Sequence, residues 1–374
     1  MNQCSKCGNE NMATQKFCTY CGEKLGTSVQ PPGVTARSFK QGRYTVQRCL
    51  GEGAFGRTWL VADENTPNRE RRALKEFYPV GLSPQLLPKA RDLFEREAQA
   101  LQKFQHEHIP KFFDFFEDQT QPATPATPCI VQEFIEGESL EKRLRDKGRM
   151  TESEVWEILR QGIDIVKYLQ ERSPHVYHRD VNPPNIILED SGGRLKVYLI
   201  DFGAVKDAVK GSLSGSTIIG KPGYAPAEQL KGVMNDTVDL YGLGATMIET
   251  LTGSKPLDVF DGNEGWYLWE DQSRQAGVTF SSGLSYFINS LTNARKDERF
   301  ADASEAMEVL NRLTKRKELK CMNKSCRHDG NKEDWIYCEK CLQAIDRRTR
   351  LCPKEREPIP MNAKYCPNHG VKVG

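Results

Sequence analysis

The sequence predicts an α+β fold with small cysteine-rich modules at either end, and three observations support this. Strand-like segments, such as residues 58–62 and 112–116, occur in the first half of the chain. Apolar residues at helical intervals follow over residues 155–169 and 240–251. All of the cysteines except Cys49 and Cys129, which we expect to be ordinary packing residues, lie toward the two ends.

Composition indicates a chain that folds without a membrane. Its 374 residues are 38% hydrophobic and 28% charged, an ordinary mixture for a globular protein. No run of 18 apolar residues occurs, and the first residues lack the charged and then apolar pattern of a signal peptide. We therefore expect a cytoplasmic protein with no membrane contact. The net charge of +2 predicts no general attraction to nucleic acid.

Residues 1–25 are predicted to form a zinc ribbon. Four cysteines have the spacing C-x2-C-x10-C-x2-C, which suits a tetrahedral Zn²⁺ site: Cys4, Cys7, Cys18 and Cys21. So short a segment cannot bury a useful core, and we expect the metal to supply most of its folding energy. A pair of redox-active C-x-x-C motifs is the alternative. Residues 26–42, rich in Pro, Gly, Ser and Thr, are predicted to be a flexible linker.

A glycine-rich stretch containing Gly51, Gly53 and Gly56 matches G-x-G-x-x-G. Taken alone this pattern is weak evidence, because it also occurs in dinucleotide-binding loops that begin a helix. Here the strand-like residues 58–62 follow, so the glycines are predicted to form the turn of a hairpin. Residues 73–75, ending in Lys75, read as the end of another strand.

Two carboxylates and an amide follow in a pattern suited to phosphoryl transfer. Residues 178–185 include Asp180 and Asn185, and an apolar strand over residues 195–200 then leads into Asp201. Such oxygen ligands can hold hard divalent cations beside a general base. In order and spacing, these residues resemble the H-R-D-x-x-x-x-N and D-F-G motifs of protein kinases. The resemblance covers about residues 44–313 and implies a two-lobed protein-kinase-like fold flanked by zinc-ribbon-like modules.

The resemblance also implies roles for individual residues. Asp180 would accept the proton of the substrate hydroxyl, and Lys75 would bind the α and β phosphates of ATP while pairing with Glu97. Three glycines would form the turn over the phosphates: Gly51, Gly53 and Gly56. Backbone groups of Glu133 and Ile135 would contact adenine. Asn185 and Asp201 would be ligands of Mg²⁺ (or Mn²⁺). Glu228 is expected to pair with Arg299, and Asp239 to anchor the backbone of the catalytic loop.

Two departures from the family pattern belong together. Asn182 stands where the family usually has a lysine that contacts the transferred phosphoryl group, and Lys221 stands where it usually has a threonine. We hypothesise that the ammonium of Lys221 reaches back beside Asp180 and replaces the missing charge, which makes Lys221 a candidate catalytic residue. The alternative is a weakened enzyme in which Lys221 faces solvent.

A second cysteine-rich region is predicted over residues 315–374, after a kinase domain over residues 43–314. Four cysteines there have the spacing C-x4-C-x11-C-x2-C, a zinc-ribbon-like pattern: Cys321, Cys326, Cys338 and Cys341. Cys352, Cys366 and His369 could form a third metal site whose fourth ligand the sequence does not identify.

The chain is thus identified as resembling bacterial, cyanobacterial-type serine/threonine kinases. The resemblance implies an ATP-dependent signalling enzyme that phosphorylates protein substrates and itself, and whose zinc modules bind protein partners. Two alternatives are an ATP-binding pseudokinase scaffold and a zinc-ribbon adaptor with weak kinase activity.

Overall fold

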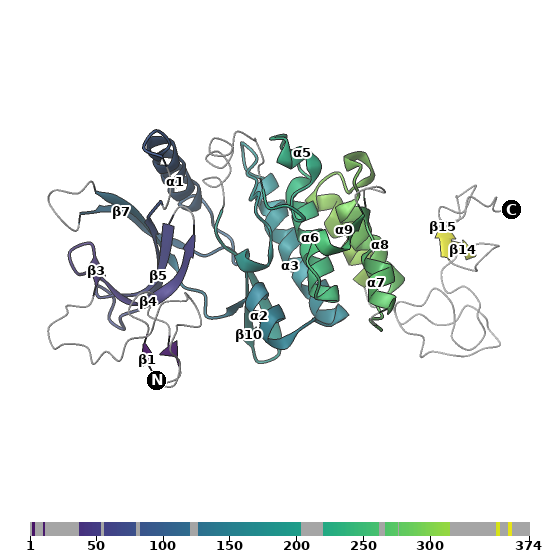
Figure 1. Ribbon diagram of the computed structural model, residues 1–374, viewed down its shortest axis with the longest axis horizontal. Helices are drawn as coiled ribbons and strands as arrows, with labels where there is room; N and C mark the ends of the chain where they lie inside the picture. Colours follow the sequence, from purple (N-terminus) through teal and green to yellow (C-terminus); the bar gives the residue numbers. More distant parts are fainter. Residues whose placement is uncertain are drawn as a thin grey trace.

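The computed structural model describes residues 2–3, 10–11, 37–53, 56–79, 83–119, 126–202, 220–261, 266–275, 277–314, 349–351 and 358–360. The structure has a smaller lobe built around a curved sheet with one helix, and a larger lobe built mainly of helices (Figure 1). The two-lobed α+β arrangement is therefore confirmed. Within the described ranges, no helix is both long and apolar enough to cross a bilayer.

The small lobe contains a six-stranded antiparallel sheet with the strand order β3-β4-β5-β6-β8-β7. Its strands, in chain order, are β3 (Ser38–Phe39), β4 (Tyr44–Gly53), β5 (Gly56–Asp63), β6 (Arg71–Phe77), β7 (Phe112–Asp118) and β8 (Thr127–Glu133). Helix α1 (Leu87–Leu101) buries Ala90, Phe94 and Ala98 in the apolar core shared with Ile130 of β8. Because strand residues alternate between faces, Cys129 and Val131 point the other way.

The face of the sheet opposite α1 carries its own apolar cluster, which includes Phe39, Tyr44, Trp59 and the two isolated cysteines. Both cysteines are buried, as expected, and burial raises the pKa of the Cys129 thiol. The prediction that residues 26–42 are a linker is wrong for its last part. Ser38–Phe39 pair with β4, and Phe39 is only 1% exposed, because the sheet face needs an apolar cover there.

The large lobe is organised around α3 (Glu152–Gln170) and α6 (Val238–Thr252), whose predicted cores are confirmed. Thr151 and Glu154 form a capping box that begins α3. Helix α6 is buried on nearly all sides, as expected for a helix apolar around its whole circumference. The other elements are α2 (Leu140–Lys147), α5 (Ala227–Leu230), α7 (Trp269–Gln275), α8 (Ser282–Thr292), α9 (Ala303–Thr314), and the turns η1 (Pro183–Asn185), η2 (Pro256–Val259) and η3 (Lys296–Glu298).

Short strands complete the lobe and the two ends of the chain. A three-stranded sheet of order β11-β10-β9 lies beside η1 and is formed by β9 (Glu138–Ser139), β10 (Ile186–Ser191) and β11 (Arg194–Leu199). The remaining strands form antiparallel pairs, β1 (Asn2–Gln3) with β2 (Glu10–Asn11), β12 (Phe260–Asp261) with β13 (Trp266–Tyr267), and β14 (Thr349–Leu351) with β15 (Pro358–Pro360). All predicted zinc ligands lie outside the described residues: Cys4, Cys7, Cys18, Cys21, Cys321, Cys326, Cys338, Cys341, Cys352, Cys366 and His369.

Candidate active site

The loop between α3 and β10 holds Asp180 with two carboxamides. Asn182 Nδ2 donates to Asp180 Oδ1 at 2.5 Å, and Asn185 Nδ2 donates to Asp180 Oδ2 at 2.9 Å. The same two nitrogens also donate to the backbone oxygen of Asp180, at 2.9 and 2.8 Å. Both carboxylate oxygens of Asp180 therefore have a donor, which fixes the orientation of a residue suited to accept a proton.

Asp239, near the start of α6, anchors the backbone of this loop. Its carboxylate accepts hydrogen bonds from the backbone N–H of His178 at 2.8 Å and of Arg179 at 2.7 Å. Burial raises the pKa of Asp239 and lowers the pKa of the fully buried His178. Arg179 has φ = 66°, a left-handed conformation that costs a non-glycine residue energy and that these two bonds help to maintain. The expected anchoring role of Asp239 is confirmed.

Lys75 lies between two carboxylates that come from different parts of the chain. Its Nζ is 2.7 Å from Glu97 Oε1 on α1 and 2.6 Å from Asp201 Oδ1, just after β11. The Glu97 side chain is 2% exposed, so its charge is held in the interior by this ammonium. The predicted pair of Lys75 with Glu97 is present.

Two hydrogen bonds place Asp201 beside the catalytic loop. The preceding residue, Ile200, donates its N–H to the backbone oxygen of Asn185 at 2.9 Å and accepts from His178 Nε2 at 3.0 Å. This second bond assigns the proton to Nε2 and leaves Nδ1 to accept from the N–H of Asp180. The structure thus brings Lys75, Glu97, Asp180, Asn185 and Asp201 into one region between the lobes.

The predicted glycine turn and the connection between the lobes frame the same region. Gly53 of β4 pairs with Gly56 of β5, and a side chain at position 56 would meet the backbone oxygen of Glu76 at 2.5 Å. Gly56 is therefore required for close packing of β5 on β6. Further along, the N–H of Glu133 already donates to the backbone oxygen of Lys111 at 2.8 Å. Any adenine contact of Glu133 would therefore use its carbonyl oxygen.

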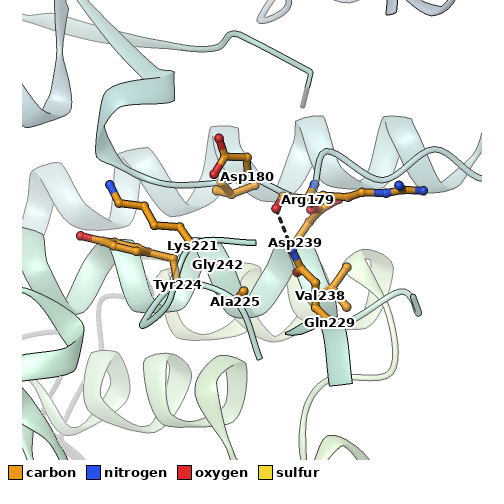
Figure 2. Close-up of a pocket in the computed structure, with 10 residues that line it drawn as sticks. Arg179, Asp180, Lys221, Tyr224, Ala225, Gln229, Val238, Asp239 and Gly242 are labelled. Carbon is orange, nitrogen blue, oxygen red and sulfur yellow. Dashed lines mark hydrogen bonds between the residues drawn. The ribbon is translucent and has the colours of Figure 1, made fainter. Parts of the chain in front are cut away.

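Lys221 lines a pocket together with Asp180, Tyr224 and Gln229. In Figure 2 its side chain extends along Tyr224, and its nitrogen ends on the same side of the pocket as the Asp180 carboxylate. The ammonium lies 4.9 Å from the centre of the Tyr224 ring, and the residue is exposed. Asn182, in contrast, is only 2% exposed and is turned inward toward Asp180.

One ion pair and one hydrogen bond support the segment that carries Lys221. The predicted pair of Glu228 with Arg299 is present, with Nη1 to Oε1 at 2.6 Å and Nη2 to Oε2 at 3.3 Å. Gln229, whose role the sequence did not predict, donates from Nε2 to the backbone oxygen of Arg179 at 2.7 Å (Figure 2). The one feature of the sequence that could have indicated this role is that Gln229 directly follows Glu228. The hydrogen bond of the Tyr224 hydroxyl to Glu249 was also missed.

Comparisons with known proteins agree on one family. The family described as "Protein kinase domain" matches residues 44–313. The chain is 35% identical over 308 residues to Serine/threonine-protein kinase F of Synechocystis sp., covering 79% of this chain and 58% of that protein. It is 34% identical to Serine/threonine-protein kinase PknA of Nostoc sp., covering 72% and 47%. The chain thus spans about half the length of these curated relatives.

A solved structure supports the fold alone. The Mycobacterium tuberculosis PknI kinase domain, in a double-mutant form, superimposes with a TM-score of 0.54 at 22% sequence identity, covering 74% of this chain and 97% of that one.

Proposed function

The chain belongs to the protein kinase family, and on that basis we propose that it transfers the γ-phosphoryl group of ATP to serine or threonine hydroxyls of proteins. One observation carries the proposal most directly. The Lys75 ammonium is held by Glu97 and Asp201, and Asp201 is joined through Ile200 to the loop that presents Asp180. A phosphate-binding cation, a carboxylate ligand and a general base are thereby gathered from two lobes.

The residues present suit magnesium nucleotide. Asn185 uses its side-chain nitrogen on Asp180, so its amide oxygen is the atom available to a cation, and Asp201 supplies a carboxylate. Asn185 and Asp201 would hold Mg²⁺ or Mn²⁺, Lys75 and the glycine turn would bind the phosphates, and Ile135 and the Glu133 carbonyl would contact adenine. When bound, the metal would neutralise phosphate charge.

Asp180 would act as the general base toward the substrate hydroxyl. Its carboxylate is oriented by Asn182 and Asn185, so little reorganisation is needed when the hydroxyl arrives. The backbone just before it, at Arg179, is held by Asp239 and Gln229, which would preserve the distance between the base and the phosphate site. This arrangement works by positioning and charge, with no covalent intermediate on the protein.

We assign Lys221 the role of stabilising charge on the transferred group. Asn182 is buried and neutral, so it cannot carry that charge to the cleft. Lys221 is a cation on the wall of the same pocket as Asp180. A positive charge aimed at developing negative charge is worth several kcal/mol in favourable cases, roughly 3 kcal/mol for one donor.

The cysteine-rich ends would add zinc modules to this enzyme. The support is their ligand spacing, which suits tetrahedral Zn²⁺ sites. In this proposal residues 1–25 and 315–374 bind protein partners, and the protein works in the cytoplasm and phosphorylates itself as well as other proteins.

The Asp180→Asn variant tests the central proposal. We expect it to bind ATP with nearly unchanged affinity, because Asp180 faces the substrate hydroxyl, and to lose phosphate transfer by about 10²- to 10⁴-fold, the usual contribution of a general base. The measurement is transfer of labelled phosphate to a generic protein substrate alongside ATP binding. Equal transfer by both forms would contradict the assignment and favour a scaffold that only binds nucleotide.

A further inference from the structure

The segment before the matched family region is part of the ATP-binding lobe. Arg37 lies ahead of residue 44, where the family match begins, and within the stretch predicted to be a linker. The backbone oxygen of Arg37 accepts from the N–H of Val46 at 2.9 Å, and Phe39 of β3 is buried in the apolar cluster. Arg37 is therefore placed by the sheet itself, and its guanidinium lies against Phe39 and Trp59 of the apolar cluster.

Arg37 neutralises a carboxylate that is buried in that cluster. Its Nη2 donates to Glu76 Oε1 at 2.5 Å, and Trp59 Nε1 donates to Glu76 Oε2 at 2.9 Å. The guanidinium carbon is 4.7 Å from the ring centres of both Phe39 and Trp59. Glu76 is 6% exposed, so its charge depends on these two donors.

Glu76 is the residue that follows Lys75 on β6. Neighbouring residues of a strand point to opposite faces, so Lys75 faces Glu97 and Asp201 while Glu76 faces Trp59 and Arg37. The backbone oxygen of Glu76 is also the atom that packs against Gly56, where the glycine turn enters β5. One short piece of backbone thus connects Arg37 to two parts of the proposed phosphate site.

We propose that Arg37 is a positioning residue for ATP, acting through Glu76 on the strand that carries Lys75. This inference rests on the proposed function, because it assumes that Lys75 and the glycine turn bind ATP phosphates. With Arg37 in place, both carboxylate oxygens of Glu76 have a donor against the apolar face, and β6 keeps its register. Without it, the carboxylate must turn toward water and pull on the backbone beside Lys75 and Gly56.

The test uses the full chain and measures its affinity for ATP in two independent ways. The Arg37→Ala variant is expected to raise both the Kd for a fluorescent ATP analogue and the KM for ATP by roughly three- to tenfold. The KM for a protein substrate should stay within a factor of about two, since the change acts on the small lobe. The Arg37→Lys variant keeps the charge and should retain most of the affinity.

A double variant and a matched control separate positioning from general loss of stability. Arg37→Ala combined with Glu76→Gln should recover most of the ATP affinity, because no unpaired charge then remains. Arg43→Ala is the control: Arg43 pairs with the buried Asp63 at 3.0 Å, at the end of β5 remote from Gly56. It should lower the melting temperature without a comparable rise in the Kd for ATP.

Three results would overturn the inference: an unchanged Kd in Arg37→Ala, an equal rise in Arg43→Ala, or no recovery in the double variant. If Arg37→Ala does not fold, Arg37→Gln, which also removes the charge but keeps a polar side chain of similar length, takes its place and should show the same rise in Kd. An unaltered chain that binds ATP but transfers no phosphate would refute the proposed function while leaving the binding measurements decisive for Arg37. No ATP binding by the unaltered chain would refute both.

Discussion

At the scale of single residues, the hydrogen bonds of Asp180 determine how the proposed general base is oriented. Its two carboxylate oxygens are each held by an amide, from Asn182 and from Asn185. The family pattern has a lysine in place of Asn182, so the substitution removes a charge and adds a second hydrogen bond to the base. In the proposed mechanism the cation that stabilises the transferred group must then come from another residue, and Lys221, which lines the same pocket as Asp180 and Arg179, is the one we assign.

The first prediction concerns Lys221. Replacing it with Met keeps the length and apolar stem but removes the charge, so kcat should fall roughly 10²- to 10³-fold while the KM for ATP changes little. Steady-state kinetics with a protein substrate measure both quantities. Lys221→Arg, which keeps the charge and can still lie over Tyr224, is the matched control and should retain most of the activity. Unchanged turnover in Lys221→Met would show that the charge is not used.

At the scale of elements, α6 serves as the support for the catalytic loop. Its buried carboxylate, Asp239, takes two backbone N–H groups of residues 178 and 179, and Gly242 leaves room for the backbone oxygen of Val181. The pair of Glu228 and Arg299 joins α5 to the segment before α9, with Thr237 accepting from Arg299 Nη1 at 3.0 Å. The segment that carries Lys221 is thus held on its C-terminal side, at Glu228.

The second prediction concerns this pair and pH. Burial alone would raise the pKa of Glu228, but the bonds to Arg299 outweigh it and hold the pKa below its ordinary value. The charged form therefore stabilises the fold above the unfolded-state pKa near 4.3, and this contribution is lost as pH falls through the lower folded-state value. Glu228→Gln should cost about 3 kcal/mol at pH 7 and less toward acid pH.

Urea unfolding at a series of pH values measures this difference. The control is Glu298→Gln, which removes an exposed carboxylate near Arg295 and should leave stability almost unchanged. A constant difference between Glu228→Gln and the unaltered chain from pH 7 down to pH 3 would show that the ion pair does not carry the effect.

At the scale of the whole molecule, contacts that join the two lobes lie both in the proposed site and beside it. Lys75 reaches across to Asp201, and the turn after α1 pairs with β11, where the N–H of Leu199 donates to the backbone oxygen of His108 at 3.0 Å. Nδ1 of the same histidine is 2.8 Å from the backbone oxygen of Val197. Relative movement of the lobes would therefore act directly on the distance between Lys75 and Asp180.

The third prediction concerns the ends of the chain. If the cysteines are zinc ligands, the full chain should carry about two zinc ions, one for each complete set of four cysteines, and a third only if the Cys352, Cys366 and His369 set is completed. Cys4→Ser combined with Cys7→Ser should lose one ion, as measured by elemental analysis of the purified protein. Cys129→Ser is the control, because that thiol is buried in the sheet. A chain without zinc, or with the same content in both variants, would favour redox chemistry.

The sequence by itself determined which residues are candidates for the site and where the main helices lie. Asp180, Asn185 and Asp201 could be identified because their spacing along the chain is short and local, and the same holds for the helix cores over residues 155–169 and 240–251. Pairs with long separation, such as Lys75 with Glu97 and Glu228 with Arg299, were predicted only through the family resemblance. Spacing alone contains no information about which distant residues meet.

Only the tertiary structure decided which other residues are buried or hydrogen-bonded around the site. Arg37 and Phe39 look like linker residues in the sequence, because two residues are too few to show a strand pattern, yet the sheet buries one and pairs the other with Glu76. Asn182 and Gln229 became part of the loop's hydrogen-bond network in the same way. Burial and hydrogen bonding depend on what packs against a residue, and that is a property of the folded chain.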